Sequence, residues 1–174
     1  MSTQYRIPGT TDDNPIVARM PRTKAMCKQC ESYSAGQAHK PVAVMSCEGA
    51  CLRGEVARQA ANFLCFEELP EATARICLGG AFTKDTGQRG LTRNARRLLA
   101  LEGCATACAS RMMVGVEPGL EPEIVQVVKL YEFDTTLFSI DDLAPEESPD
   151  MLRADTGAPS GAKASAESAS PCCG

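Results

Sequence analysis

The sequence predicts an α/β domain with a mostly parallel sheet of about four strands, covered by helices in two or three layers. Short apolar segments with strand character alternate along the chain with segments of helical spacing. This alternation is typical of parallel sheets, because parallel strands need crossover connections that are usually helices. The chain has 174 residues and 44% apolar content, which is enough for one ordinary hydrophobic core.

The first two strands and the helix between them are expected before residue 81. PVAVMS at 41–46 is a short apolar run suited to a buried strand. The following stretch, GACLRGEVARQAANFL, has apolar residues at helical spacing from Val56 to Leu64. We expect a second strand over 73–80, ended by a glycine pair.

For the third strand, the local helical propensity and the alternating order of strands and helices give different predictions. LTRNARRLLALEG has helical propensity throughout, yet a strand at 97–102 completes the alternating order and is preferred here. In the crossover before it, Gly87 and Gly90 predict a short or broken helix. EIVQVVKLYEF at 123–133 has β-branched residues and partial alternation, so we expect the fourth strand there.

The chain divides into three parts by composition. Residues 1–37 are expected to be an irregular N-terminal segment, and residues 38–140 to be the α/β domain. The tail at 141–174 is poor in large apolar residues and is expected to be disordered, although it ends in Cys172, Cys173 and a glycine.

Charge and hydropathy exclude two function classes. The net charge of −4 and the pI near 5.1 argue against nucleic-acid binding, and the arginines between residues 89 and 97 are interpreted as a solvated helix face. An apolar run long enough for a membrane span and an export signal are both absent from the sequence, so we expect a cytoplasmic protein. In a reducing compartment, ten cysteines favour free thiols, metal ligands or redox chemistry over a disulfide framework.

The cysteines follow the predicted strands. Cys47 comes after the first strand, Cys77 closes the second and Cys104 follows the third. Open parallel sheets bind ligands at the carboxyl ends of their strands, so these thiols are expected at one edge. Cys51 and Cys108 lie four residues after Cys47 and Cys104, on the first turn of the next helix, and are expected to face the same edge.

Such a thiol cluster predicts a soft metal ion. A thiol at a helix N-terminus is expected to have a lowered pKa, and adjacent thiolates repel one another unless a cation lies between them. Sulfur ligands select Zn(II), Cu(I) or an iron–sulfur cluster, and four thiolates suit tetrahedral zinc. A single cysteine would be interpreted as a small buried hydrophobe. The repeated CxxxC pattern favours a site, and an all-sulfur site favours a binding protein over an enzyme.

Three motifs resemble those of the DGC-domain family, which is described as zinc-binding on the strength of four cysteines. They are SCEGACLRGEVARQAA, ICLGG and LALEGCATAC, within residues 41–133. The resemblance implies metal ligands at Cys47, Cys77, Cys104 and Cys108, and it supports the strand at 97–102. Glu102 stands where the family has Asp. Cys51 replaces a small polar residue and adds a fifth thiol.

Two other functions stay open for the same cysteines. One is a thiol redox or sulfur-transfer protein, with Cys104 or Cys108 as nucleophile and the tail or the CxxC motif as resolving thiol. The other is an iron–sulfur protein. Besides a metal ion, the expected partner is therefore a redox or metal-transfer protein.

The remaining candidates are weaker. Cys27 and Cys30 form a CxxC that can be redox-active or can bind a metal with borrowed ligands, such as His39 or the tail. Cys65 is expected to pack in the core. Met112 and Met113 are also interpreted as packing residues, with a copper ligand as the alternative.

Overall fold

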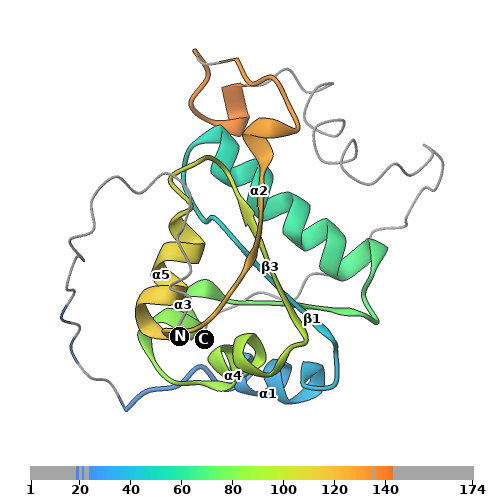
Figure 1. The fold of residues 1–174 in the computed structure, drawn as a ribbon, viewed down its shortest axis with the longest axis vertical. Helices are drawn as coiled ribbons and strands as arrows, with labels where there is room; N and C mark the ends of the chain where they lie inside the picture. The colour runs from blue at the N-terminus through green and yellow to red at the C-terminus, as the bar shows by residue number, and fades with distance from the viewer. Residues whose placement is uncertain (1–18, 20, 22–23, 135, 143–174) are drawn as a thin grey trace, which may run out of the picture.

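A four-stranded parallel sheet forms the centre of the protein (Figure 1). The computed structural model describes residues 19, 21, 24–134 and 136–142. The strands are β1 (Val42–Ser46), β2 (Thr73–Arg75), β3 (Arg97–Glu102) and β4 (Glu123–Gln126), in the spatial order β2-β1-β3-β4. The predicted α/β class with four parallel strands is confirmed, and so is the strand at 97–102 despite its helical propensity.

The register aligns the carboxyl ends of neighbouring strands. Ser46 in β1 lies opposite Leu101 in β3, and Glu102 lies opposite Gln126 in β4. The backbone N–H of Cys47 donates to the carbonyl of Leu101 at 2.8 Å, so the pairing of β1 with β3 continues one residue past β1. The loops that follow β1 and β3 therefore begin side by side.

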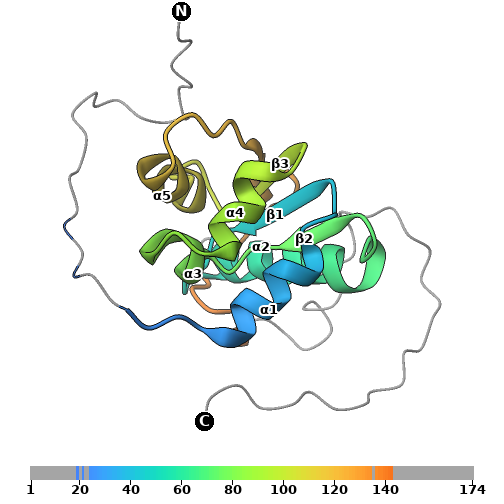
Figure 2. The same ribbon diagram turned by 90° about the horizontal axis from the view of Figure 1, so that it is seen from below.

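Within the described residues, five α-helices cover the two faces of the sheet. They are α1 (Lys28–Gln37), α2 (Leu52–Phe63), α3 (Leu78–Thr83), α4 (Gly87–Asn94) and α5 (Cys108–Val116). A π-helical turn, η1 (Leu64–Glu68), continues α2, and short 3-10 turns lie at Val127–Lys129 and Ile140–Asp142. Figure 1 shows α2 on one side of the strands, and Figure 2 shows α1, α3 and α4 together on the other.

The alternation of side chains along the strands builds a separate core on each face. Ala43 and Met45 of β1 pack with the α3, α4 and α5 side, whereas Val44 packs with α2. In β3, Ala100 faces the first core and Leu101 the second. Successive residues of a strand point to opposite faces, so both faces of this sheet are buried and the fold has three layers.

Two expected strands are shorter than predicted. The strand expected over 73–80 ends at Arg75, because the glycine pair lies inside α3 and does not end a strand. The N–H of Cys77 donates to the side-chain oxygen of Gln88 at 2.9 Å, and the Cys77 carbonyl accepts the first helical bond of α3. The strand expected over 123–133 ends at Gln126, where a 3-10 turn begins.

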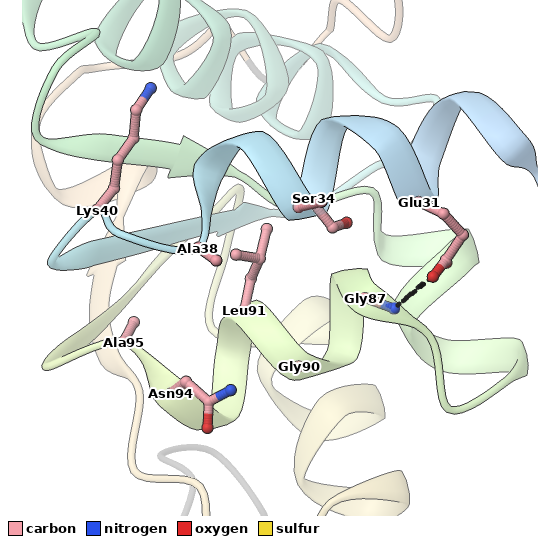
Figure 3. A pocket seen from close by; sticks show the side chains of 10 residues that line it. Glu31, Ser34, Ala38, Lys40, Gly87, Gly90, Leu91, Asn94 and Ala95 are labelled. Atoms are coloured by element: carbon pink, nitrogen blue, oxygen red, sulfur yellow. Dashed lines mark hydrogen bonds between the residues drawn. The ribbon is translucent and has the colours of Figure 1, made fainter.

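The N-terminal segment departs from its predicted irregular character. Residues 28–37 form α1, whose sequence KQCESYSAGQ has no apolar stripe that would indicate a helix. The helix is held by tertiary contacts with α4. Both carboxylate oxygens of Glu31 accept the N–H of Gly87 at 3.2 Å, and Ser34 is buried between the two helices. Figure 3 shows this contact at the end of a shallow pocket of about 270 Å³.

The crossover from β2 to β3 has the predicted broken helix, in the form of α3 and α4. Arg89 differs from the expected solvated residue, because its guanidinium donates to the carbonyls of Ala81 and Phe82 at 2.7 and 2.9 Å. Within the part of the chain that the structure describes, no helix is both long and apolar enough to cross a membrane.

Candidate metal centre

Cys47 has thiol neighbours in its own β1–α2 loop and at the start of α5. Its thiol is within hydrogen-bonding range of Cys108, and its sulfur accepts the backbone N–H groups of Gly49 and Gly103. The negative charge of Cys104 also raises the pKa of Cys108. Cys51 is the N-cap residue of α2, and its sulfur flanks Gly49 together with that of Cys47. We call Cys47, Cys51, Cys104 and Cys108 the rim thiols.

Glycines allow both loops, β1–α2 and β3–α5, to touch the first turn of α2 through their backbones. A Cβ atom on Gly54 would lie 2.7 Å from the carbonyl oxygen of Gly49. A Cβ on Gly103 would lie 2.8 Å from backbone atoms of Arg53 and Gly54. Real Cβ atoms essentially never approach so closely, so Gly103 must be glycine for the β3–α5 loop to lie against the first turn of α2.

A buried carboxylate organises the loop that carries Cys104 and Cys108. Glu102 has no exposed surface, and its side chain accepts the N–H and the hydroxyl of Ser110, both at 2.7 Å. It also accepts the N–H of Ala109 at 3.4 Å. These bonds satisfy free N–H groups in the first turn of α5 and place a negative charge beside the thiols. The chain enters the helix through Ala107, in the left-handed region at φ 51° and ψ 52°.

The predicted lowering of the thiol pKa is wrong for two of the rim thiols. Burial raises the pKa of Cys47, and the charges of Cys108 and Glu102 add to this effect. Cys108 is exposed, but partial desolvation by the surrounding protein, together with the charges of Glu102 and Cys104, still raises its pKa. Desolvation and nearby negative charge favour the neutral thiol, and here they outweigh the favourable field of a helix N-terminus.

Arg75 connects the ends of β1 and β2. It is only 9% exposed, and its guanidinium donates to Ser46 Oγ at 2.7 Å and to the Ile76 carbonyl at 2.7 Å. It also pairs with Glu48 at 2.8 Å. Arg75 also donates to Asn62 of α2 at 3.0 Å. The other three partners of the guanidinium, Ser46, Glu48 and Ile76, stand directly before or after Cys47 and Cys77, so it helps to fix the backbone that carries both thiols.

Cys77 has a different neighbour from the one expected. It is exposed, and it is within hydrogen-bonding range of Cys30, whose thiol also contacts Cys27. Burial and the bond to Cys27 raise the pKa of Cys30 to about 12. The N–H and thiol of Cys30 lower the pKa of Cys27. We call Cys27, Cys30 and Cys77 the Cys30 cluster.

The thiols of the predicted site are thus brought together in pairs rather than in one closed group. Cys47 is a neighbour of Cys108, and the charge of Cys104 raises the pKa of Cys108. Cys77 belongs instead to the Cys30 cluster. Among the residues that the structure describes, no group of three or more His, Cys, Asp and Glu side chains is arranged to hold a metal ion.

Several other sequence candidates have plain structural roles. His39 is exposed in a turn, and Cys65 is buried at 2% exposure in the core beside α2. Met113 is fully buried in the opposite core, whereas Met112 is partly exposed. Cys172 and Cys173 lie outside the described residues, as does most of the tail at 141–174.

Sequence reasoning missed two residues that position thiols. Arg75 had a signal, because a charged residue inside an apolar strand segment needs buried partners. Gln88 had none: its role depends on α4 packing beside both α1 and the end of β2, which no local pattern shows.

The fold and the thiols define a small three-layer α/β protein with cysteines after the strands of a parallel sheet. A family model for the DGC domain matches residues 43–143, more than half of the chain, and the protein belongs to the DGC-domain family. The predicted family is therefore confirmed. α1, with Cys30 in its first turn and Cys27 as its N-cap residue, precedes the matched region. No curated protein and no solved structure matches the chain significantly.

Proposed function

We propose that this protein binds Zn(II) through the thiolates of Cys47, Cys77, Cys104 and Cys108, with Cys51 as a further thiol at the rim. Membership of the DGC-domain family and the abundance of cysteine are consistent with a metal-binding role. The observation that carries the proposal is the contact of Cys47 with Cys108 beside the buried carboxylate of Glu102.

The donor atoms fit a soft cation better than any other occupant. In the metal-free protein, burial and the Glu102 charge favour protonated thiols at Cys47 and Cys108. A divalent ion reverses this preference, because thiols lose their protons when they bind metal and the nearby carboxylate then faces a positive charge. Binding is therefore expected to release protons and to tighten as the pH rises.

The accessibility of the thiols supports a metal carrier over a purely structural site. Cys77 and Cys108 are exposed, and Cys104 is partly exposed. A closed structural site buries its ligands, whereas these sulfurs are open to thiols of a partner protein that exchanges the ion. We propose such a metal-transfer partner, and we place the protein in the cytoplasm, where its thiols stay reduced.

Metal analysis of anaerobically purified protein, combined with its absorption spectrum, tests the proposal. We expect a colourless protein with one zinc ion per chain. Titration of the metal-free protein with Co(II) then reports the ligands, because thiolate ligands give intense charge-transfer absorption that carboxylates do not. The tail cysteines are removed beforehand as Cys172→Ser and Cys173→Ser, so that only the domain thiols are counted.

Cys104→Ala is compared with Cys65→Ala. Cys65 is buried in the core beside α2 and outside the rim thiols, so its replacement controls for general loss of packing. We expect zinc affinity to fall by at least tenfold in Cys104→Ala and to be unchanged in Cys65→Ala. Equal zinc affinity in both variants would contradict the proposal, and a brown protein containing iron and labile sulfide would favour the iron–sulfur alternative.

A further inference from the structure

Three thiols outside the rim meet in a chain of contacts. The Cys30 thiol has the thiols of Cys27 and Cys77 as its neighbours. Cys27 and Cys77 are exposed, whereas Cys30 is partly buried. The central sulfur therefore has two possible disulfide partners, and both of them are open to a reagent from solution.

A buried amide links the backbones of Cys30 and Cys77. Gln88 is 2% exposed; its side-chain oxygen accepts the N–H of Cys77 at 2.9 Å, and its side-chain nitrogen donates to the carbonyl of Cys30 at 3.5 Å. Cys30 and Cys77 are distant in the sequence, and Gln88 of α4 holds their backbones close together. Their proximity therefore does not depend on the thiols themselves.

The residue before Gln88 holds α1 against α4. Gly87 donates its N–H to Glu31, the residue after Cys30, as Figure 3 shows. A Cβ atom on Gly87 would lie 2.7 Å from the Cβ of Ser34 and 3.1 Å from its hydroxyl oxygen. Only glycine permits this approach of the two helices. Gly90, one turn later in α4, has nothing within 4 Å of such a Cβ.

We propose that Cys27, Cys30 and Cys77 form a thiol–disulfide exchange site in which Cys30 pairs alternately with its two neighbours. The oxidant is a low-molecular-weight disulfide, RSSR. The Cys27 thiolate attacks RSSR and releases one RS⁻, and the Cys30 thiolate then attacks Cys27 Sγ and releases the second. Two electrons pass from the protein sulfurs to RSSR, and the two thiol protons end on two RSH molecules.

The second step moves the disulfide without further oxidation. The thiolate of Cys77 attacks Cys30 Sγ, the Cys30–Cys77 bond forms, and the Cys27–Cys30 bond breaks. Cys27 leaves as a thiolate and takes up the proton that Cys77 lost. The exchange uses no metal ion and is tested on metal-free protein, so its result does not depend on zinc binding. Cys77 in a disulfide cannot bind zinc, so the two proposed roles of this thiol exclude each other in one molecule.

The experiment equilibrates metal-free, full-length protein with buffers of reduced and oxidised glutathione. Free thiols are trapped by acid and alkylation, and disulfides are assigned by peptide mass spectrometry. We expect both Cys27–Cys30 and Cys30–Cys77 disulfides. Cys77→Ser should retain only the first, Cys27→Ser only the second, and Cys30→Ser should lose both. Pairing of Cys77 with other cysteines as often as with Cys30 would overturn the proposal.

Two glycine variants test the geometry. Gly87→Ala should push α1 from α4 and lower the Cys30–Cys77 disulfide several-fold. Cys27–Cys30 should persist, because Cys27 is the N-cap residue of α1 and Cys30 lies in its first turn. The matched control Gly90→Ala should leave both disulfides at their original levels. Circular dichroism verifies that each variant is folded. An unchanged Cys30–Cys77 level in folded Gly87→Ala would also overturn the proposal.

Discussion

The carboxylate of Glu102 and Ser110 are joined by two hydrogen bonds of 2.7 Å, one from the backbone N–H and one from the hydroxyl. Both residues have no exposed surface. The pair connects the end of β3 to the first turn of α5, so the loop with Cys104 and Cys108 is anchored at both ends. A buried charge in this place is costly unless it is fully hydrogen-bonded, which the Ser110 and Ala109 contacts achieve.

Glu102→Gln is therefore expected to lower the free energy of unfolding by about 1–3 kcal/mol, because an amide cannot accept all the bonds that the carboxylate accepts. It should also weaken zinc binding by removing a negative charge beside the rim thiols. Denaturant unfolding and zinc competition with a chromophoric chelator measure the two effects. Exposed Glu121→Gln is the control and should change neither. Unchanged stability in Glu102→Gln would show that the network contributes little.

Gly103→Ala tests the backbone contact between the β3–α5 loop and the first turn of α2. Since its Cβ would lie 2.8 Å from Arg53 and Gly54, we expect a loss of about 1–3 kcal/mol of stability from the forced backbone shift. The shift should also move the Gly103 N–H away from the sulfur of Cys47 and reduce zinc affinity. Gly115→Ala is the matched control in α5, where a Cβ has open space, and it should stabilise the helix by up to about 1 kcal/mol. Equal melting temperatures for the two variants would contradict this account.

Arg75→Met tests the connection between the ends of β1 and β2. The substitution keeps an apolar stem but leaves Ser46 and the Ile76 carbonyl without their buried donor, so we expect a loss of about 2 kcal/mol in denaturant unfolding. Arg97→Met is the comparison, because Arg97 pairs with Glu123 on the exposed surface and its loss should change stability little. A larger loss in Arg97→Met than in Arg75→Met would refute the assigned role of Arg75.

The two thiols of the CxxC motif should differ in their reactivity with pH. Only the thiolate reacts with iodoacetamide, and its fraction rises as the pH passes through the pKa of the thiol. The pKa of Cys27 is lowered by the N–H and thiol of Cys30, whereas burial raises that of Cys30 to about 12. In metal-free reduced protein at pH 7–8, we expect Cys27 to be alkylated first and Cys30 to stay largely unmodified, as measured by mass spectrometry.

Cys30→Ala provides the control for this prediction. The variant keeps the backbone N–H at position 30 but removes the thiol donor, so the pKa of Cys27 should rise towards its ordinary value of 9.0. The midpoint of Cys27 alkylation should move to higher pH in the variant. Faster labelling of Cys30 than of Cys27 in the unmodified protein would show the assignment to be reversed.

Local sequence patterns predicted much of the fold because they reflect local requirements. The apolar run before Cys47 and the alternating order of elements required a buried parallel sheet, and the order overrode helical propensity at 97–102. The glycine pair at Gly79 and Gly80 misled the prediction, because helix α3 starts at Leu78 after the Cys77 N–H is taken by Gln88. That bond connects segments that no local window contains.

The sequence by itself determined the family, the four parallel strands and the placing of Cys47, Cys77 and Cys104 after strands. Only the tertiary structure decided which thiols are neighbours and whether the pKa of each is raised or lowered. Periodicity reports which face of an element is apolar, but not which distant element covers it. The contact between Cys30 and Cys77 follows from α1 packing on α4, and the raised pKa of Cys47 follows from burial. Both depend on the exclusion of water by parts of the chain that are far apart in sequence.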